Sequence, residues 1–168
     1  MSDFRRFNGL FITGTDTEVG KTIVTGGLAA ILCEKGYNVG VMKPVETGCA
    51  GDEGTLLPKD AEFLWKMSRE NEPLEKIVPY RFKEPLAPAV AAELEGVNID
   101  IDKLVRNFEE ISNRREFVLV EGVGGLLVPL SRKFLVLDLI KLFKLPILVI
   151  SRAGLGAINH TLLTVRHA

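Results

Sequence analysis

A loop bounded by two glycines, set between an apolar run and a helical pattern, constrains the fold of this chain more than any other feature. The loop reads GTDTEVGKT from Gly14 to Thr22, and it follows the apolar residues Leu10, Phe11 and Ile12. A strand, a glycine loop and a helix in this order are the context of a phosphate-binding loop. Backbone N–H groups converge on phosphate in such a loop, and the dipole of the following helix adds positive potential. The sequence therefore predicts a site for the phosphates of a nucleoside triphosphate.

This loop is longer than the common pattern G-x-x-x-x-G-K-[ST], because five residues separate Gly14 from Gly20. Gly20 leaves room for close approach of the phosphates, and Lys21 is expected to neutralise the β and γ oxygens. The Thr22 hydroxyl is expected to bind Mg²⁺, which bridges the same phosphates. The alternative is a glycine turn that caps a helix whose first residue happens to be lysine. The strand-to-helix context favours the phosphate loop.

Short apolar runs alternate with segments of helical period along the rest of the chain. The runs 10–12, 117–120 and 147–150 predict buried parallel strands. A further strand, second in the sequence, is predicted at 38–42, after Gly36, where the preceding helix is expected to stop. The expected helix faces consist of Val24, Leu28, Ile31 and Leu32, of Leu104, Phe108 and Ile111, and of Val136, Leu139, Ile140 and Phe143. Stretches 48–58 and 79–88 are predicted loops, and 156–168 is a predicted helix. This alternation predicts an α/β fold of P-loop NTPase type, with a doubly wound, mostly parallel sheet flanked by helices on both faces.

Length and composition favour one domain, because 168 residues with 46% hydrophobic content suffice for a single core. A formal net charge of −1 gives no sign of a nucleic-acid or anionic membrane partner. Cys33 and Cys49 lack the spacing of a disulfide framework or a zinc site, which fits a reducing compartment. The N-terminal apolar run is too short for a signal-peptide core or a membrane span. We therefore expect a cytoplasmic protein that forms one ATP-binding domain over residues 1–168.

Four segments together resemble the dethiobiotin synthetase family. They are GTDTEVGKT, VMKPVETG at 41–48, LVEGVGGLLVPL at 119–130 and GLGAINH at 154–160, in the order of the family and over nearly the whole chain. The longer phosphate loop is itself a mark of that family. Family members usually continue with another strand and more helices, which contact the adenine ring and have no counterpart here. We therefore expect this domain to lack the C-terminal strand and helices of the family.

The resemblance implies an ATP- and Mg²⁺-dependent ring closure. In the family, 7,8-diaminononanoate and CO₂ form a carbamate, which takes the γ-phosphoryl group of ATP and then cyclises to the ureido ring of dethiobiotin. ADP and phosphate are the other products, and the reaction is the penultimate step of biotin biosynthesis. The implied partners of this chain are these small molecules and a second copy in a homodimer.

Three residues are predicted to be catalytic, namely Lys21, Lys43 and Thr17. Lys43 matches a catalytic lysine of the family, and it follows a strand at the sheet edge where ligands bind in α/β folds. Thr17 matches a family residue that hydrogen-bonds the carbamate or a phosphate, although a turn residue that bonds its own backbone would look the same. Thr47 matches a position near the diamine, and an ordinary loop hydroxyl explains it almost as well.

Two carboxylates complete the predicted metal site. Glu121 closes the apolar run 117–120, which is where an acidic residue points toward Mg²⁺ in many P-loop proteins. Asp60 matches a second metal-binding carboxylate of the family, whereas on its own it would be a helix N-terminal charge that favours the dipole. Since Mg²⁺ takes few protein ligands, Thr22, Asp60 and Glu121 form a sufficient set. The predicted nucleotide-binding residues are Glu18, Val19, Gly20, Lys21, Thr22, Ile23, Asp60, Glu121, Gly122, Val123 and Gly124.

A last group lies at the junction before the predicted C-terminal helix. Gly154, Gly156 and Asn159 could hold a carboxylate through free N–H groups, and the resemblance implies that they bind the substrate carboxylate across the homodimer interface. A lone helical histidine more often packs than reacts, so His160 is expected to be structural. Packing roles are also expected for Phe63, Trp65 and Met67.

Two other functions are compatible with a phosphate loop. A P-loop amide-forming synthetase of the kind that amidates corrinoid precursors shares the fold and the activation by ATP, but the long loop and Lys-Pro after the second strand argue against it. A nucleotide switch of the partitioning or GTPase type would bind partners without transforming a metabolite. The guanine-reading pattern Asn-Lys-x-Asp of GTPases does not occur in the sequence.

Overall fold

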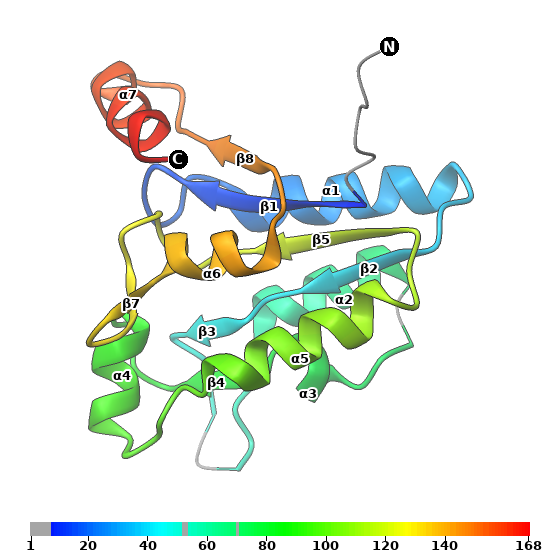
Figure 1. Cartoon of the computed structure of the whole chain (residues 1–168), viewed down its shortest axis with the longest axis horizontal. Helices are drawn as coiled ribbons and strands as arrows, with labels where there is room; N and C mark the ends of the chain where they lie inside the picture. Colours follow the sequence, from blue (N-terminus) through cyan, green and yellow to red (C-terminus); the bar gives the residue numbers. More distant parts are fainter. Residues whose placement is uncertain (1–7, 52–53, 70) are drawn as a thin grey trace.

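The computed structural model describes residues 8–51, 54–69 and 71–168. Its elements follow in the order β1 (Gly9–Gly14), α1 (Lys21–Glu34), β2 (Val39–Met42), β3 (Val45–Thr47), α2 (Lys59–Ser68), α3 (Leu74–Ile77), β4 (Tyr80–Phe82), α4 (Pro88–Leu94), α5 (Ile101–Ser112), β5 (Phe117–Glu121), β6 (Pro129–Ser131), β7 (Phe134–Leu135), α6 (Val136–Phe143), β8 (Ile147–Ile150) and α7 (Ala157–His167). Figure 1 shows their arrangement. Residues 1–7, which belong to the N-terminal stretch judged too short for a signal peptide, and 52–53 of a predicted loop lie outside the described part.

A parallel sheet of four strands, in the order β2-β5-β1-β8, forms the centre of the fold. The arrowheads of these strands point to the same side in Figure 1. Their carboxyl ends therefore meet at one edge of the sheet, where ligands bind in open α/β folds. The phosphate loop follows β1, Lys43 follows β2 and Glu121 ends β5 at this edge. The predicted α/β fold with a mostly parallel sheet is confirmed.

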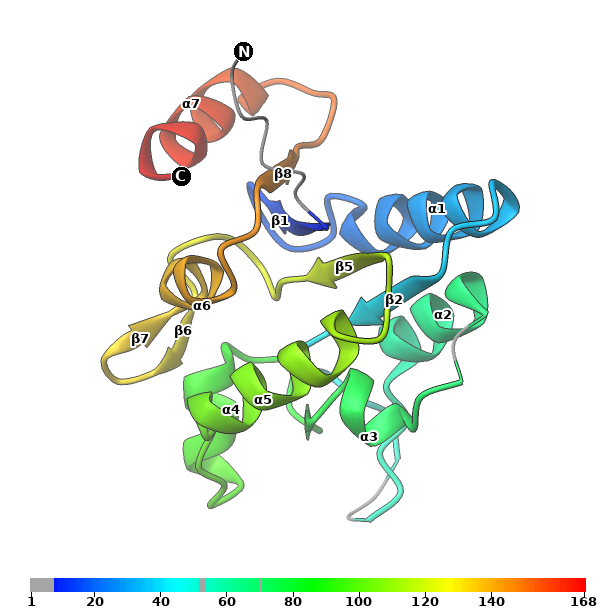
Figure 2. The same ribbon diagram turned by 45° about the vertical axis from the view of Figure 1, so that its right-hand side comes forward.

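Helices cover both faces of the sheet, as predicted. Successive residues of a strand point to opposite sides, so apolar strands leave an apolar surface on each face that a helix must cover. Figure 2 shows α1 and α2 on one side and α5 and α6 on the other. The core beneath α5 and α6 takes from the strands Phe11, Met42, Val118 and Val120. The core beneath α1 and α2 takes Ile12, Val39, Val41 and Leu119. The predicted apolar faces of α5 and α6 pack into the first of these cores.

The predicted buried face of α1 is wrong in part, since Ile31 is 52% exposed. The buried positions of this helix are instead Lys21, Thr25, Gly26 and Ala29. Small residues allow α2 to lie close to α1, so that Phe63 of α2 covers Gly26 directly. A search for hydrophobic period does not detect a helix face of small residues, which allows close helix packing without large apolar side chains.

Two neighbouring glycines of α1 give a matched test of this packing. A Cβ on Gly26 would overlap the ring of Phe63 at Cε1 and lie 3.0 Å from Cδ1, whereas a Cβ on Gly27 meets nothing within 4 Å. We expect Gly26→Ala to lower the free energy of unfolding by about 1–2 kcal/mol, because the ring must move. Gly27→Ala should raise it by about 0.5–1 kcal/mol through lost backbone entropy in the unfolded chain. Urea unfolding of both variants measures the difference, and equal effects would contradict the close packing of α1 on α2.

Several elements differ from the predictions. β8, which forms one edge of the sheet, is half-buried and not buried as predicted. The predicted loop 79–88 contains β4, which pairs in parallel with β3. A short antiparallel pair, β6 and β7, also has no counterpart among the predictions. None of the helices in the described part combines the length and apolar character that a membrane span requires.

Candidate active site

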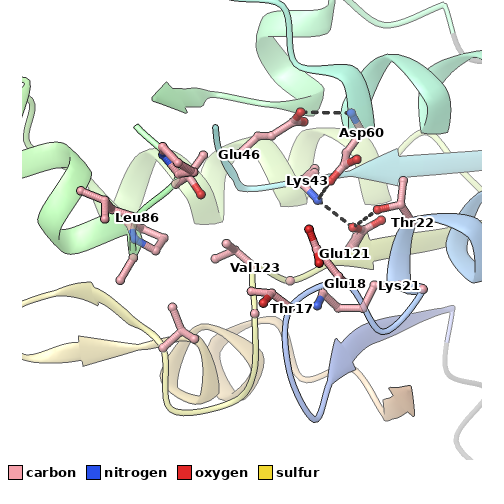
Figure 3. A pocket seen from close by; sticks show the side chains of 18 of the residues that line it. Thr17, Glu18, Lys21, Thr22, Lys43, Glu46, Asp60, Leu86, Glu121 and Val123 are labelled. Carbon is pink, nitrogen blue, oxygen red and sulfur yellow. Dashed lines mark hydrogen bonds and ion pairs between the residues drawn. The ribbon is translucent and has the colours of Figure 1, made fainter. Parts of the chain in front are cut away.

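A cavity of about 840 Å³ opens at the carboxyl edge of the sheet. The phosphate loop, the start of α1, the ends of β2 and β5 and the segment before α4 surround it (Figure 3). Its lining includes almost every predicted nucleotide-binding or catalytic residue, namely Thr17, Glu18, Gly20, Lys21, Thr22, Ile23, Lys43, Asp60, Glu121, Gly122, Val123 and Gly124. Thr47, the predicted diamine contact, lines it as well. The fold thus brings together residues more than a hundred positions apart in the sequence.

The phosphate loop reaches the first turn of α1 through two residues with left-handed backbone angles. Gly20 has φ 99° and Glu18 has φ 54°. Glycine takes such angles without strain, whereas a glutamate does so only when its surroundings hold it there. Lys21 is buried, and its Nζ donates a hydrogen bond to the Asp16 carbonyl oxygen at 2.7 Å. Burial lowers the pKa of Lys21, although Glu121 and Asp16 act in the opposite direction.

A buried ion pair lies at the floor of the cavity. Lys43 Nζ is 2.7 Å from Glu121 Oε1 and 2.7 Å from Asp60 Oδ2. The Thr22 hydroxyl donates a hydrogen bond to the same Glu121 oxygen at 2.7 Å, as Figure 3 shows. The side chains of Lys43 and Glu121 are 5% and 0% exposed, and that of Asp60 is 45% exposed. Burial alone would lower the pKa of Lys43, but the charges and hydrogen bonds of Glu121 and Asp60 outweigh it and raise that pKa.

This group of side chains fits a small, hard cation. Glu121 Oε2 is buried and has no hydrogen-bond partner in the described part of the chain. Thr22, Asp60 and Glu121 supply only oxygen atoms, which are the ligands that Mg²⁺ prefers. No cluster of three or more His, Cys, Asp or Glu side chains suited to a metal occurs within the described residues. A site that uses a hydroxyl and few carboxylates is compatible with Mg²⁺, which keeps several waters or phosphate oxygens in its shell.

The two carboxylates of Lys43 differ in burial, and they should differ in their effect on stability. We expect Glu121→Gln to lower the free energy of unfolding by about 3 kcal/mol, because it removes one partner of a fully buried pair. Asp60→Asn should cost about 1 kcal/mol or less, because solvent screens an exposed partner. Urea unfolding of the two variants without nucleotide makes the comparison. A larger cost for Asp60→Asn would contradict the described geometry.

Sequence reasoning missed several residues of the site. Glu46 lines the cavity, and its carboxylate accepts hydrogen bonds from the backbone N–H groups of Asp60 at 3.0 Å and Ala61 at 2.9 Å. Burial raises the pKa of Glu46 despite these bonds. The apolar wall of the cavity consists of Phe63, Pro85, Leu86, Ala87, Pro88 and Val128. Glu46 lies inside the segment VMKPVETG, and the prolines lie in the predicted loop. Their position in the sequence was therefore the only indication that they belong to the site.

Some predicted residues lie outside the cavity. Val19 does not line it, because its side chain turns toward Gly14 on the inner side of the loop. Gly154 and Gly156 are exposed between β8 and α7, and Asn159 is exposed in the first turn of α7, at the outer edge of the fold. Within one copy of the chain they are not part of the cavity, and the prediction that assigns them to substrate across a dimer stays a prediction.

The packing expectations are confirmed in part. His160 is exposed on α7, so the expectation that it packs is wrong for the described chain. Met67 packs against the core beneath α1 and α2, as expected, while Phe63 both packs there and faces the cavity. Trp65 is an exposed residue of α2.

Fold and site together define a class of protein. A parallel α/β sheet carries a glycine loop at the end of β1, a buried lysine at the start of α1, and a threonine and carboxylates grouped beside it. These are the parts of a P-loop protein that binds a nucleoside triphosphate.

Comparison with known proteins narrows this class. A family model described as an AAA domain matches residues 8–168. The ATP-dependent dethiobiotin synthetase BioD of Thermodesulfovibrio yellowstonii is 46% identical over 164 residues, which cover 94% of this chain and 68% of that protein. The proteins of the same name from Bacillus subtilis (strain 168) and Anaeromyxobacter sp. are 44% and 49% identical, over 95% and 94% of this chain and 68% and 69% of their own lengths. The chain belongs to the ATP-dependent dethiobiotin synthetase family.

Proposed function

We propose that this chain is an ATP-dependent carbon–nitrogen ligase that closes the ureido ring of dethiobiotin from 7,8-diaminononanoate and CO₂, with ADP and phosphate as the other products. The observation that carries the proposal is the grouping of Lys21, Lys43, Thr22 and Glu121 in one cavity of a chain that belongs to this family. Such a cavity suits a reaction in which a carbamate oxygen attacks the γ-phosphorus and ADP leaves. The second amine then attacks the carbamoyl carbon, and phosphate leaves as the ring closes.

The phosphate loop would bind the triphosphate of ATP. Backbone N–H groups between Thr17 and Thr22 would surround the β- and γ-phosphates, and Lys21 would exchange its bond to the Asp16 carbonyl oxygen for phosphate oxygens. We propose Thr22, Asp60 and Glu121 as the residues that hold Mg²⁺, which supplies charge neutralisation on the phosphates when it is bound. The free Oε2 of Glu121 supports this assignment.

Lys43 would stabilise the charge that develops during transfer. Glu121 and Asp60 keep its ammonium protonated and fix its position at the cavity floor. A fixed cation in a water-poor site stabilises a developing negative charge without reorganisation. The Thr17 hydroxyl, at the exposed tip of the loop, would donate to the carbamate or to a phosphate oxygen. Thr47 would contact the diamine from the end of β3.

The remaining assignments concern the assembly. We propose that the chain acts as a homodimer in which Gly154, Gly156 and Asn159 of one copy bind the substrate carboxylate of the other, since one copy leaves them outside the cavity. A cytoplasmic location is proposed with it, because ATP is supplied there and Cys33 and Cys49 are free thiols. The ATP-binding unit is proposed to be a single domain, since the central sheet, β3 and the first turn of α2 all contribute to one cavity.

Phosphate release tests the proposed reaction. The chain is incubated with ATP and Mg²⁺, and 7,8-diaminononanoate or bicarbonate is omitted in turn. We expect phosphate release only when both are present, since the carbamate is the phosphoryl acceptor. Phosphate release at the same rate with and without the diamine would contradict the proposal and favour a nucleotide switch. The relatives do not favour that alternative or a corrinoid-type amide synthetase.

A further inference from the structure

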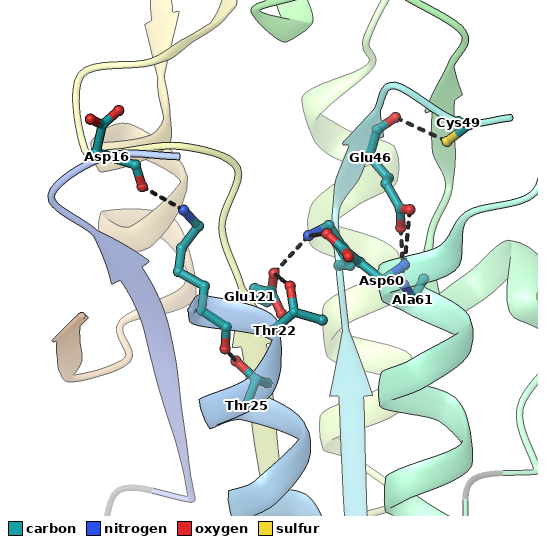
Figure 4. A network of polar contacts seen from close by, with 10 residues as sticks. Asp16, Thr22, Thr25, Glu46, Cys49, Asp60, Ala61 and Glu121 are labelled. Carbon is teal, nitrogen blue, oxygen red and sulfur yellow. Dashed lines mark hydrogen bonds and ion pairs between the residues drawn. The ribbon is translucent and has the colours of Figure 1, made fainter. Parts of the chain in front are cut away.

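The first turn of α2 is held by a residue from another element. Free N–H groups at a helix start need acceptors, but the N-cap of α2 is Pro58, which provides no side-chain hydrogen bond. The carboxylate of Glu46 in β3 takes this place. Its Oε1 accepts from Asp60 N at 3.0 Å and its Oε2 from Ala61 N at 2.9 Å, as Figure 4 shows. These are the second and third helical positions, which a local capping residue would serve.

Glu46 is 5% exposed, so its carboxylate is held in a largely buried position. Burying a carboxylate is unfavourable unless its hydrogen bonds compensate. Both of its oxygens are bonded to the start of α2, and the main chain of the same residue pairs with β4. The carboxylate therefore ties β3 to α2 at a defined distance.

Asp60 connects this anchor to the ion pair of Lys43 and Glu121. The Asp60 side chain is 45% exposed, so packing does not fix it, and its Oδ2 lies 2.7 Å from Lys43 Nζ. Lys43 in turn contacts Glu121. Because Glu46 follows Lys43 by three residues, one short segment carries both the lysine and the group that anchors the backbone of Asp60. The position of the Asp60 carboxylate relative to Glu121 therefore depends on Glu46.

We propose that Glu46 is a positioning residue which, by anchoring the first turn of α2, holds the Asp60 carboxylate where it can bind the Mg²⁺ of a magnesium–ATP complex. The inference rests on the nucleotide site of the proposed function and adds a residue to it. Partners of metal ligands typically change metal affinity about 10- to 100-fold when they are removed.

Asp100 offers a matched control. It caps α5 at the same two helical positions, where its Oδ1 accepts from Asp102 N at 2.9 Å and Lys103 N at 3.2 Å. However, α5 packs on the other face of the sheet, and Asp100 does not line the cavity. Glu46→Ala and Asp100→Ala should each lower the free energy of unfolding through loss of a helix cap. Only the first should change metal-dependent binding.

Calorimetric titration with magnesium–ATP, and with ATP in excess EDTA, separates the two roles. For Glu46→Ala we expect the Kd of magnesium–ATP to rise about 10-fold or more, with metal-free ATP binding unchanged. Asp100→Ala should bind both forms as the unaltered chain does. Glu46→Gln, which keeps one acceptor oxygen, should fall in between and provides the reading if the alanine variant does not fold.

An unchanged Kd in the Glu46 variants would overturn the proposal, as would an equal loss of metal-free binding or the same change in Asp100→Ala. Failure of the unaltered chain to bind magnesium–ATP would overturn it too. The titrations contain no diamine, so they test this inference independently of the proposed reaction. An unaltered chain that binds magnesium–ATP but forms no dethiobiotin would contradict the proposed reaction only.

Discussion

Lys43→Met is expected to lower kcat for dethiobiotin formation by about 10²–10³-fold while leaving magnesium–ATP binding intact. The ammonium is buried at the cavity floor between Glu121 and Asp60, and these carboxylates are the proposed metal ligands. Methionine keeps an unbranched, apolar side chain as far as Cε and removes the charged ammonium group. Binding should not weaken, because the two carboxylates lose a cation that competes for them in the absence of nucleotide. Steady-state kinetics with calorimetry on the same preparation measures both quantities.

The control for this variant is Lys35→Met, which removes an exposed lysine just after α1 and outside the cavity. Its kcat should equal that of the unaltered chain. Urea unfolding shows whether Lys43→Met is folded, since Glu121 is left without its buried partner. A folded Lys43→Met with near-normal kcat would remove Lys43 from the catalytic role.

Lys21→Ala should instead weaken nucleotide binding and turnover together. Lys21 is the first residue of α1, and its ammonium lies inside the loop that is proposed to surround the phosphates. A hydrogen bond to a charged group contributes about 1.5–3 kcal/mol, so we expect the Kd of ATP to rise at least about 10-fold. Because the same charge is needed during transfer, kcat/KM should fall by about 10³-fold or more.

The two lysine variants therefore separate binding from chemistry. Lys21→Ala changes both the Kd of ATP and kcat, whereas Lys43→Met changes kcat alone. Lys35→Ala serves as the matched control for the phosphate-loop variant. Unaltered ATP affinity in a folded Lys21→Ala would contradict the placement of the triphosphate in this loop.

The parts of the fold that the sequence predicts well depend on local signals. Each of these features can be recognised within its own short window of sequence: the phosphate loop, the runs that form β1, β2 and β5, and the apolar faces of α5 and α6. β3 and β4 have three residues each and carry no period, so nothing local distinguishes them from loop. The buried face of α1 was not predicted, because Gly26 and Ala29 are small residues that give no hydrophobic period but allow close packing.

The site was predictable to the extent that each residue matched a motif. Lys43, Asp60 and Glu121 were assigned to one site from the sequence, and the structure brings both carboxylates within 2.7 Å of Lys43 Nζ. Glu46 could not be assigned, because its partners are backbone groups 14 and 15 residues away on α2. Gly154, Gly156 and Asn159 do not line the cavity of their own chain, so their assignment to the substrate carboxylate stays a prediction.

A labelled carbon tests whether this cavity joins CO₂ to the diamine with hydrolysis of ATP to ADP and phosphate. The chain is incubated with ATP, Mg²⁺, 7,8-diaminononanoate and ¹³C-bicarbonate, and the products are analysed by mass spectrometry. We predict dethiobiotin that carries the label in its ureido carbonyl, in an amount equal to the phosphate released. Phosphate released without labelled dethiobiotin, or an absence of both despite measured binding of magnesium–ATP, would contradict the proposed ring closure.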